Sequence, residues 1–475
     1  MRKTKIVCTL GPATDREGVL EALVQEGMNV ARLNFSHGSH EEHGKRIQAV
    51  RELSEKANLP VAVLLDTKGP EIRTGELRED KVFLKNGETF ILYAKERIGD
   101  ETGVSITFPA LYRDVSAGSR ILLDDGLISL KVEEIVGEDI HCQIQNDGWL
   151  SAHKGINVPD VHLNMPYMSE RDKNDILFGV EKEVDFVAAS FVRTGEDVDE
   201  IRTFLKENGG GGIHIISKIE NMEGVKNIDA IIRKSDGIMV ARGDMGVELP
   251  PEEVPAIQKL IIRKVYEAGK QVVTATQMLD SMMKNPRPTR AEVTDVANAV
   301  YDGTSAIMLS GETAAGKYPV ESLQMMVRIA ERTEADINYR HRFEHNTPRA
   351  AKDITAAISH ATCTTSYDLD AKAIVVVTKS GRSARMISKY RPACMIISGT
   401  TEGRVYRQLG MSWGVNPILV KEKKDIFDLF SHAIDVAKEK SLVEKDDLVV
   451  LTSGVPLGVS GTTNMLKVQI VDGEA

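Results

Sequence analysis

The chain has 475 residues, of which 42% are hydrophobic, 27% charged and 5% aromatic, and its formal net charge is −10. This is the composition of an ordinary globular protein, and it excludes a disordered chain, a collagen-like fibre and a disulfide scaffold. The net acidity argues against a general nucleic-acid binder, which needs a basic face. At roughly 150 residues per domain, the length predicts about three domains.

The sequence gives no sign of disulfide, targeting or membrane segments. The cysteines, at positions 8, 142, 363 and 394, are too scattered for a Cys-x-x-Cys pair, so we expect reduced thiols. The basic N-terminus has too short an apolar run for a signal peptide. No stretch approaches the ~18 apolar residues of a membrane span. We therefore expect a soluble cytoplasmic protein with neither membrane nor nucleic acid as a partner.

Eight short Val- and Ile-rich segments alternate with amphipathic stretches in residues 1–69 and 167–340. Near-continuous apolar strands separated by helices indicate a parallel sheet that is covered on both faces. Eight such units favour a (β/α)8 TIM barrel, and the alternative is an open doubly wound sheet. The predicted strands are residues 5–10, 30–35, 61–66, 185–191, 214–220, 237–243, 271–277 and 306–312.

Residues 70–166 follow the third predicted strand and have a different sequence pattern. Short alternating runs punctuated by Gly, Asn and Asp predict a small inserted all-β barrel domain. Its position after a barrel strand places it over the mouth of the barrel, which suggests a hinged lid. The predicted strands are residues 89–93, 104–108, 120–123, 127–132 and 138–145.

Residues 341–475 return to an α/β pattern, with a predicted helix at 354–366. Five predicted strands with helices between them indicate an open doubly wound domain at the C-terminus. These strands are residues 373–379, 395–399, 415–420, 448–454 and 465–471.

If the barrel forms, reactive side chains should gather where its strands end. Glu220 and Asp244 end consecutive strands, which lie ~4.8 Å apart in a barrel. Two carboxylates at that separation suit a hard divalent cation such as Mg2+ or Mn2+. The alternative is a pair of solvated loop acids or helix N-caps.

Lys218 lies two residues before Glu220 and therefore projects to the same side. Arg32, Lys68 and Arg73 add positive charge near the same strand ends. A basic mouth in a globally acidic protein favours a phosphorylated, multiply anionic substrate. Taken one at a time, each cation is equally explained by a surface salt bridge.

Other strand-end residues are ambiguous. Asn34, Ser36, Asp66 and Thr67 offer oxygen donors that could hold a second cation, although helix capping is the simpler explanation. The Gly243–Asp244 peptide could donate N–H groups to a carboxylate. The hydroxyls of Thr276 and Ser310 could relay a proton or simply be satisfied by the backbone, and the second explanation is favoured by the residues alone.

Several strings along the whole chain resemble the pyruvate kinase family. They are TKIVCTLGPA at 4–13, MNVARLNFSHG at 28–38, LDTKGPEIRTG at 65–75, ISKIEN at 216–221, MVARGDMGVE at 239–248, TATQMLDSM at 274–282 and MLSGETAAGKYP at 308–319. The resemblance implies transfer of the phosphoryl group of phosphoenolpyruvate to ADP, giving pyruvate and ATP.

The resemblance also implies roles for individual residues. Glu220 and Asp244 would bind Mg2+, Lys218 would face the phosphoryl group in transit, and the Gly243–Asp244 backbone would cradle the substrate carboxylate. The remaining implied roles are phosphate binding by Arg32 and Arg73, a K+ site at Asn34, Ser36, Asp66 and Thr67, nucleotide contacts from Arg32, Asn34, His37, Arg73 and Lys154, and enolate protonation through Thr276 and Ser310. K+-independent family members carry Lys where this chain has Glu71, so K+ dependence is expected.

In the C-terminal domain, residues 378–383 resemble the effector phosphate loop of regulated family members, and residues 460–464 resemble a neighbouring loop. We expect a phosphorylated small-molecule effector here, although such a loop could also bind nothing. The loop residues are Thr378, Lys379, Ser380, Gly381, Arg382 and Ser383. The resemblance further implies a homotetramer, and we do not expect the extra C-terminal domain of some bacterial members. The alternatives for function are a metal-dependent barrel lyase or aldolase and a catalytically silent metabolite-binding regulator.

Overall fold

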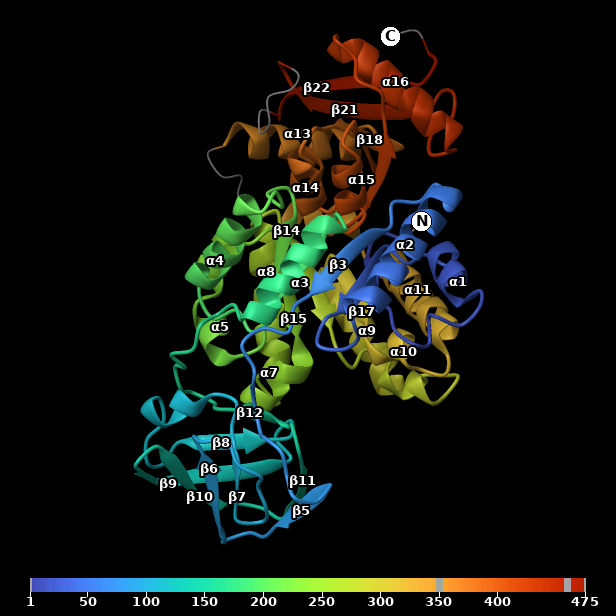
Figure 1. Ribbon diagram of the computed structural model, residues 1–475. Coiled ribbons are helices and arrows are strands. Elements are labelled where there is room, and N and C mark those ends of the chain that lie inside the picture. Colours follow the sequence, from blue (N-terminus) through green and yellow to red (C-terminus); the bar gives the residue numbers. More distant parts are fainter. Residues whose placement is uncertain (1, 347–352, 457–462, 474–475) are drawn as a thin grey trace.

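The computed structural model describes residues 2–346, 353–456 and 463–473. Figure 1 shows three parts in a row, with the barrel in the middle, a β domain beyond one end of it and an α/β domain against the other end. The N-terminus lies in the barrel and the C-terminus in the α/β domain. None of the helices within the described residues is long and apolar enough to cross a membrane.

The central part is a closed barrel of eight parallel strands, which confirms the predicted TIM barrel. In spatial order the strands are β1 (Lys5–Thr9), β17 (Ala306–Leu309), β16 (Gln271–Ala275), β15 (Gly237–Ala241), β14 (His214–Ile219), β13 (Phe186–Ala189), β3 (Ala62–Asp66) and β2 (Val30–Asn34). The helices around and between them are α1 (Val19–Gln25), α2 (His40–Ala57), α3 (Glu170–Glu181), α4 (Gly195–Glu207), α5 (Met222–Lys226), α6 (Ile228–Lys234), α7 (Arg242–Glu248), α8 (Val254–Glu267), α9 (Arg290–Asp302), α10 (Gly311–Ala314) and α11 (Pro319–Asp336), with a 3-10 turn η2 (Asp280–Met283).

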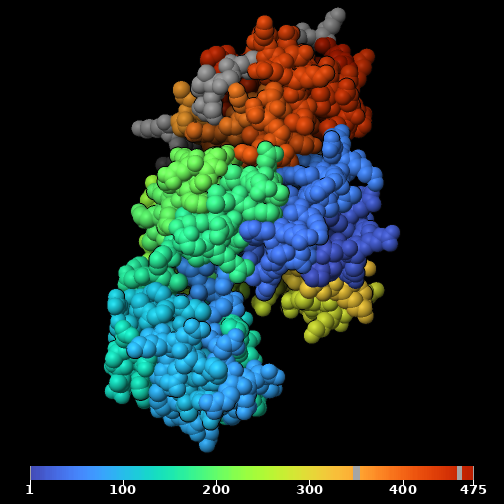
Figure 2. Space-filling view, viewed as in Figure 1, coloured from blue at the N-terminus to red at the C-terminus, as the bar shows by residue number. Residues whose placement is uncertain are grey.

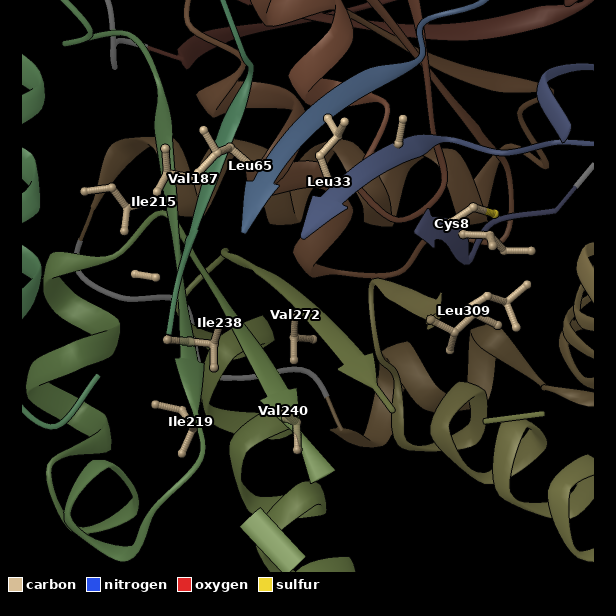
Figure 3. Packing of buried hydrophobic residues seen from close by; sticks show 14 of the residues in the cluster. Cys8, Leu33, Leu65, Val187, Ile215, Ile219, Ile238, Val240, Val272 and Leu309 are labelled. Carbon is tan, nitrogen blue, oxygen red and sulfur yellow. The ribbon is translucent and has the colours of Figure 1, made fainter. Parts of the chain in front are cut away.

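The alternation of side chains along each strand produces two cores. Residues such as Leu64, Ile216 and Met239 point into the barrel, where they form one buried cluster. Their neighbours point outward against the helices, as Leu65, Ile215 and Ile238 do in Figure 3. Strands that are apolar on both sides fit only a sheet covered on both faces, which is why the sequence pattern identified them.

The predicted strands begin within a residue of the observed ones, but most extend too far at their C-terminal ends. Residues 242–244 form the first turn of α7, and Glu312 lies in α10. Thr276 and Gln277, predicted as strand, have φ values of +68° and +52°. The chain therefore turns sharply where β15, β16 and β17 meet the mouth, and these turns depend on tertiary contacts that a local pattern does not contain.

The inserted domain is all-β, as predicted. Its strands are β4 (Ile72–Arg73), β5 (Lys81–Leu84), β6 (Thr89–Tyr93), β7 (Gly103–Ser105), β8 (Arg120–Leu123), β9 (Ile128–Val136), β10 (Asp139–Ile144), β11 (Gly148–Ser151) and β12 (Gly155–Asn157), with a 3-10 turn η1 (Pro109–Arg113). They form a seven-stranded sheet, β4-β12-β8-β9-β10-β6-β7, and a β11-β5 ribbon. The expected barrel is closed only by an isolated bridge between Thr74 and Ile106, because the edge strands β4 and β7 are too short for a ladder.

The C-terminal domain has a five-stranded sheet in the order β20-β19-β18-β21-β22. The strands are β18 (Ala373–Val377), β19 (Met395–Thr400), β20 (Val415–Leu419), β21 (Leu448–Gly454) and β22 (Thr463–Ile470), and the helices are α12 (Tyr339–Asn346), α13 (Ile354–Asp368), α14 (Arg382–Lys389), α15 (Gly403–Leu409) and α16 (Ile426–Glu439). Val375 packs in one cluster with α16, and Ile374 packs in another with α13 and α14. Helices on both faces confirm the doubly wound prediction, except that β22 pairs antiparallel with β21.

The C-terminal domain closes the N-terminal end of the barrel. Met411 belongs to the same buried cluster as the inward-facing strand residues. Lys5 Nζ donates to the Val415 carbonyl at 2.7 Å, and Arg407 pairs with Asp185 at 2.8 Å. The opposite end, where the strands finish, is therefore the one that faces the inserted domain.

Candidate active site

Four charged side chains meet where the barrel strands end. Arg32 and Asp66 lie on the neighbouring strands β2 and β3, and Lys218 and Glu220 come from β14 and its end. In each case the residue two positions earlier, such as Leu64 or Ile216, points into the barrel, so these side chains continue the inner row. The alternating pattern therefore carries the chain from an apolar barrel interior to a charged mouth.

Lys218 is the centre of this group. Its ammonium lies 2.8 Å from Ser190 Oγ, 3.0 Å from Glu220 Oε1 and 3.2 Å from Asp66 Oδ1. Asp66 also accepts a hydrogen bond of 2.6 Å from Arg32 Nε. Arg32 and Lys218 are thus held by the same carboxylate and present two cations side by side.

Charge pairing keeps Asp66 and Lys218 ionised in spite of burial. Burial disfavours the charged form of Asp66, but Arg32 and Lys218 together lower the pKa of its carboxyl. Burial likewise works against the ammonium of Lys218, but Asp66 and Glu220 raise its pKa. The ammonium of Lys218 and the carboxylate of Asp66 are therefore both charged at the bottom of the site.

Glu220 has the least complete partnership of these residues. The side chain is fully buried, and its Oε2 accepts a hydrogen bond of 2.6 Å from Phe191 N. Apart from the Lys218 ammonium, no partner meets Oε1 in the described part of the chain. Burial raises the pKa of Glu220 to about 7, and the charge of Asp244 adds to this rise while Lys218 opposes it.

The structure brings the two predicted metal ligands to one place. Asp244 lies in the first turn of α7, directly after β15, which pairs with β14. A buried carboxylate oxygen whose one partner among the described residues is an ammonium, beside a second carboxylate, is a good ligand set for a divalent cation. The residues present therefore fit Mg2+ or Mn2+. No cluster of three or more His, Cys, Asp or Glu suitable for a metal occurs among the described residues, so a cation here would have two protein carboxylates as ligands.

Thr276 and Gly243 form a second feature of the mouth. Thr276 Oγ1 accepts a hydrogen bond of 2.7 Å from Gly243 N and donates one of 2.6 Å to Ala275 O. Thr276 has φ +68°, which is unusual for a β-branched residue and is maintained only by surrounding contacts. Arg242 supplies one such contact, since its Nη2 donates to Thr276 O at 2.7 Å.

Ser310 also lies at the mouth, at the N-terminus of α10. Its Oγ is buried and has no hydrogen-bond partner among the described residues, while its backbone N–H donates to Glu312 at 2.7 Å. A buried hydroxyl without a partner is costly, and water or a ligand would satisfy it.

The oxygen donors predicted for a monovalent cation lie at the C-terminal ends of the adjacent strands β2 and β3 or directly after them. Asn34 and Asp66 are register partners, and Thr67 follows Asp66 directly. Asn34 Oδ1 accepts from Ser36 N at 3.1 Å, so it caps a turn, whereas the helix cap of α2 is Ser39. All of these donors are oxygen atoms, and only Asp66 contributes a carboxylate. Such a donor set suits K+ chemically.

The lid residues are held within the inserted domain and its linker. Arg73 makes a two-pronged pair with Glu71 (2.9 and 2.7 Å), and Lys154 pairs with Asp124 at 2.9 Å. Lys68 lies 4.0 Å from Glu71. Thus the structure does not bring Arg73 or Lys154 into contact with Lys218, and His37 is exposed on the loop after β2.

A cavity of about 280 Å3 separates the lid from the barrel. Its walls include Glu71, Asp125, Phe191, Asp244 and Glu248. The open notch between the two parts is visible in Figure 2. The lid already touches the barrel at one edge, since Asn157 Nδ2 donates to Glu248 at 3.0 Å.

Three residues that contribute to the site were not predicted. Ser190 bridges Lys218 and the carbonyl of Thr67, Phe191 binds Glu220 through its backbone with φ +53°, and Arg242 holds Thr276. A Cβ on Gly69 would come within 2.8 Å of Ser190, so glycine is required there. The only sequence signal was the position of Ser190, Phe191 and Arg242 at or near predicted strand ends.

In the C-terminal domain, the loop 378–383 connects β18 to α14. Chain order along the sheet reverses between β18 and β21, and ligands in open α/β sheets bind at such a switch point. Gly381 takes φ +74° at the helix N-cap, and Ser383 Oγ lies 2.5 Å from Thr463 Oγ1. Lys379 and Arg382 are exposed. Of the second loop, residues 460–462 lie outside the described residues.

A TIM barrel whose mouth holds two cations and two carboxylates beside an inserted β domain is typical of an enzyme that acts on an anionic substrate, and the same groups suit phosphoryl transfer. Comparison with known proteins gives the family. The family description "Pyruvate kinase, barrel domain" matches residues 1–323, and "Pyruvate kinase, alpha/beta domain" matches residues 356–469.

Individual relatives agree with this result. A pyruvate kinase of Clostridium acetobutylicum is 52% identical over 473 residues, which are 99% of this chain and 100% of the relative. One of Geobacillus stearothermophilus is 50% identical over 99% of this chain and 80% of its own length. The crystal structure of a pyruvate kinase from Cryptosporidium parvum superposes with a TM-score of 0.94, at 41% identity, over 99% of this chain and 96% of that one.

The chain therefore belongs to the pyruvate kinase family. It is a phosphotransferase of the class that converts phosphoenolpyruvate and ADP to pyruvate and ATP.

Proposed function

We propose that phosphoryl transfer takes place above Lys218, between a phosphoenolpyruvate bound at the barrel mouth and an ADP bound under the lid. Lys218 carries this proposal, because it is the buried cation at which Asp66, Ser190 and Glu220 converge. Phosphoryl transfer needs positioning and charge neutralisation more than it needs a nucleophile. A fixed ammonium supplies both at low cost of reorganisation.

Divalent metal and K+ would be held at the two oxygen-rich positions. Glu220 and Asp244 would bind Mg2+ or Mn2+, which supplies charge neutralisation for the substrate oxygens when bound. Asn34, Ser36, Asp66 and Thr67 would hold K+. Glu71, which pairs with Arg73, agrees with dependence on K+ by resemblance to the family.

The nucleotide and the proton have separate residues. Arg32, Asn34, His37, Arg73 and Lys154 would contact the phosphates of ADP, which requires Arg73 and Lys154 to leave Glu71 and Asp124 as the lid closes. After transfer, Thr276 would orient a water towards the enolate carbon, and the partnerless hydroxyl of Ser310 would complete the relay. Gly243 N would meet the substrate carboxylate once Thr276 releases it.

A phosphorylated effector would bind at residues 378–383. The supporting observations are the position of this loop at the switch point of the sheet and the exposed cations Lys379 and Arg382. By resemblance to the pyruvate kinase family we also expect a cytoplasmic homotetramer.

A coupled assay with phosphoenolpyruvate, ADP, Mg2+ and K+ tests the whole proposal. We expect pyruvate formation that stops when the divalent cation is chelated and falls sharply when K+ is replaced by a large organic cation. The variant Glu71→Lys should lose much of its dependence on K+. Turnover that persists without ADP would instead indicate a lyase, and binding of substrate without turnover would indicate a regulator.

A further inference from the structure

The junction between the barrel and the C-terminal domain contains a second group of buried and half-buried cations, away from the mouth. Helix α14 lies on the side of the C-terminal domain that faces the barrel, as Figure 1 shows. Its N-terminus carries the loop 378–383, whereas its last turn and the residues that follow contact the barrel. The two ends of this eight-residue helix are about 12 Å apart.

A narrow recess at this junction is lined by basic and hydroxyl side chains. The basic residues are Lys270 from the barrel and Arg385, Lys389 and Arg391 from the C-terminal domain. Serine hydroxyls complete much of the wall, and no acidic residue is among its described lining residues. The recess has a volume of about 10 Å3, which is room for one oxygen atom.

Arg391 is held rigidly against this recess. It is only 7% exposed, and its φ of +50° is unusual for a non-glycine residue. Its Nη2 donates to Gly303 O at 2.8 Å, and its guanidinium lies 4.6 Å from the centre of the Trp413 ring. Its Nε is buried and meets no hydrogen-bond partner in the described part of the chain. The donor is therefore built into the structure and left without an acceptor.

The recess adjoins a larger cavity of about 310 Å3, and Tyr266, Lys389 and Arg391 line both. Arg263 and Arg342 add two more cations to this cavity, and the aromatic rings of Phe343 and Tyr390 complete a wall. Its acids are Glu267 and Asp302, and the Asp302 carboxylate is already paired with Lys259. The positive charge of the cavity is thus only partly compensated.

We propose that this junction is an anion site for a phosphate group, with one oxygen in the recess beside Arg391 and the remainder of the ligand in the larger cavity. The site is distinct from the loop 378–383 and from the barrel mouth. A ligand in it would contact residues of both domains at once. Gln271 Oε1, a buried acceptor of the same recess, meets no hydrogen-bond partner among the described residues. A hydrogen-bearing oxyanion would satisfy it as well as Arg391, whereas a halide would satisfy only the donors.

The state of the cations agrees with such a ligand. Burial lowers the pKa of Arg391 to about 9 and that of Lys270 to about 8, and it also lowers the pKa of Arg385 and Lys389. Their hydrogen bonds go largely to backbone carbonyls, such as Ser380 O for Arg385 and Ile232 O for Lys270. Burial disfavours the charged form of these side chains, and the negative charge of a bound anion would stabilise it.

Titration calorimetry with inorganic phosphate tests this site, using the full chain at constant ionic strength. Arg32→Met and Ser383→Glu together form the background, because we expect them to weaken phosphate binding at the mouth and at the loop 378–383. We expect this background chain to bind phosphate at one remaining site. Adding Lys389→Met, or separately Arg263→Met, should weaken that binding about tenfold or more, the cost of one charged hydrogen bond.

Lys372→Met is the matched control, since Lys372 is exposed in the same domain and lines neither cavity. It should leave phosphate binding unchanged. Because Arg263 lies on α8 of the barrel and Lys389 in the C-terminal domain, folding failure of one variant leaves the other to decide. Absence of phosphate binding in the background chain, or equal binding with Lys389→Met and Arg263→Met, would overturn the proposal. A sugar phosphate that displaces inorganic phosphate would identify an organic ligand, and failure to displace it would identify free phosphate.

Discussion

Lys218 shows how much a single residue can decide at this mouth. Its ammonium pairs with Asp66 and Glu220, which neutralise it in the resting site. In the proposed reaction a phosphoryl group passes between two anionic oxygens, and this cation would be needed most in the transition state. Its contribution should therefore appear in the rate of the chemical step and much less in substrate affinity.

We predict that Lys218→Met lowers kcat roughly a thousandfold or more, the scale of losing a cation that stabilises a moving phosphoryl group. The KM for phosphoenolpyruvate should stay within a few-fold, because Arg32 and the metal ligands remain. Steady-state kinetics measures both quantities, and Lys206→Met on the exposed face of α4 is the control. A change mainly in KM would contradict the role assigned to Lys218.

At the same scale, sequence reasoning found the charged residues but not their partners. Lys218, Glu220 and Asp244 stood out because charge at the end of an apolar strand is unusual. Ser190 did not, because one serine at a strand end is equally consistent with a backbone-satisfied residue. The sequence predicts nucleotide contacts for Arg73 and Lys154, whereas in the structure they pair with Glu71 and Asp124, and a local pattern does not indicate how the inserted domain is placed.

Among the elements, the strands were predictable and the turns after them were not. Apolar runs on two-sided strands identify the eight barrel strands almost without gaps. The first turn of α7, by contrast, depends on Gly243 N meeting Thr276 Oγ1 across two strands. The two-residue strand β4 exists because it pairs with β12, and the short β12 because it also pairs with β8, so no local pattern indicates either strand.

The loop between β18 and α14 offers a prediction at this scale. Ser383 is buried to 7% exposure, and its Oγ lies beside Thr463 Oγ1. Replacing it with Glu places a carboxylate where an effector phosphate would sit, and like charges repel. We expect Ser383→Glu to abolish activation, so that the activity is the same with and without a sugar phosphate or nucleoside monophosphate.

Activation is measured at subsaturating phosphoenolpyruvate, where an effector has its largest influence. Ser441→Glu is the control, because Ser441 follows α16 and is exposed. It adds the same charge to the same domain away from the loop. Undiminished activation of Ser383→Glu would place the effector elsewhere.

At the scale of the whole molecule, each end of the barrel faces a different domain. The strand ends face the lid, and the strand beginnings are sealed by the C-terminal domain through Met411 and the contact of Lys5 with Val415. Catalysis and regulation would thus act on the same strands from opposite directions. Charge at the sealed end should therefore affect how firmly the two domains hold together.

Lys5 makes this dependence measurable through pH. Burial lowers the pKa of Lys5 to about 7, with Arg2 and Lys3 contributing and Glu334 opposing. The unfolded chain holds this proton up to about pH 10.4. Between these values the unfolded state binds more protons than the folded state, so this group makes the free energy of unfolding rise with pH. The stabilisation is complete above the unfolded pKa and is lost as pH falls through about 7.

We expect the unfolding temperature of the wild-type chain to rise relative to that of Lys5→Met between about pH 7 and about pH 10. Scanning calorimetry across this range measures the difference, in which all other titrating groups cancel. Lys206→Met, an exposed lysine on α4, should run parallel to the wild type. Parallel curves for Lys5→Met as well would mean that Lys5 stays charged in the folded protein, and that the junction accommodates its charge.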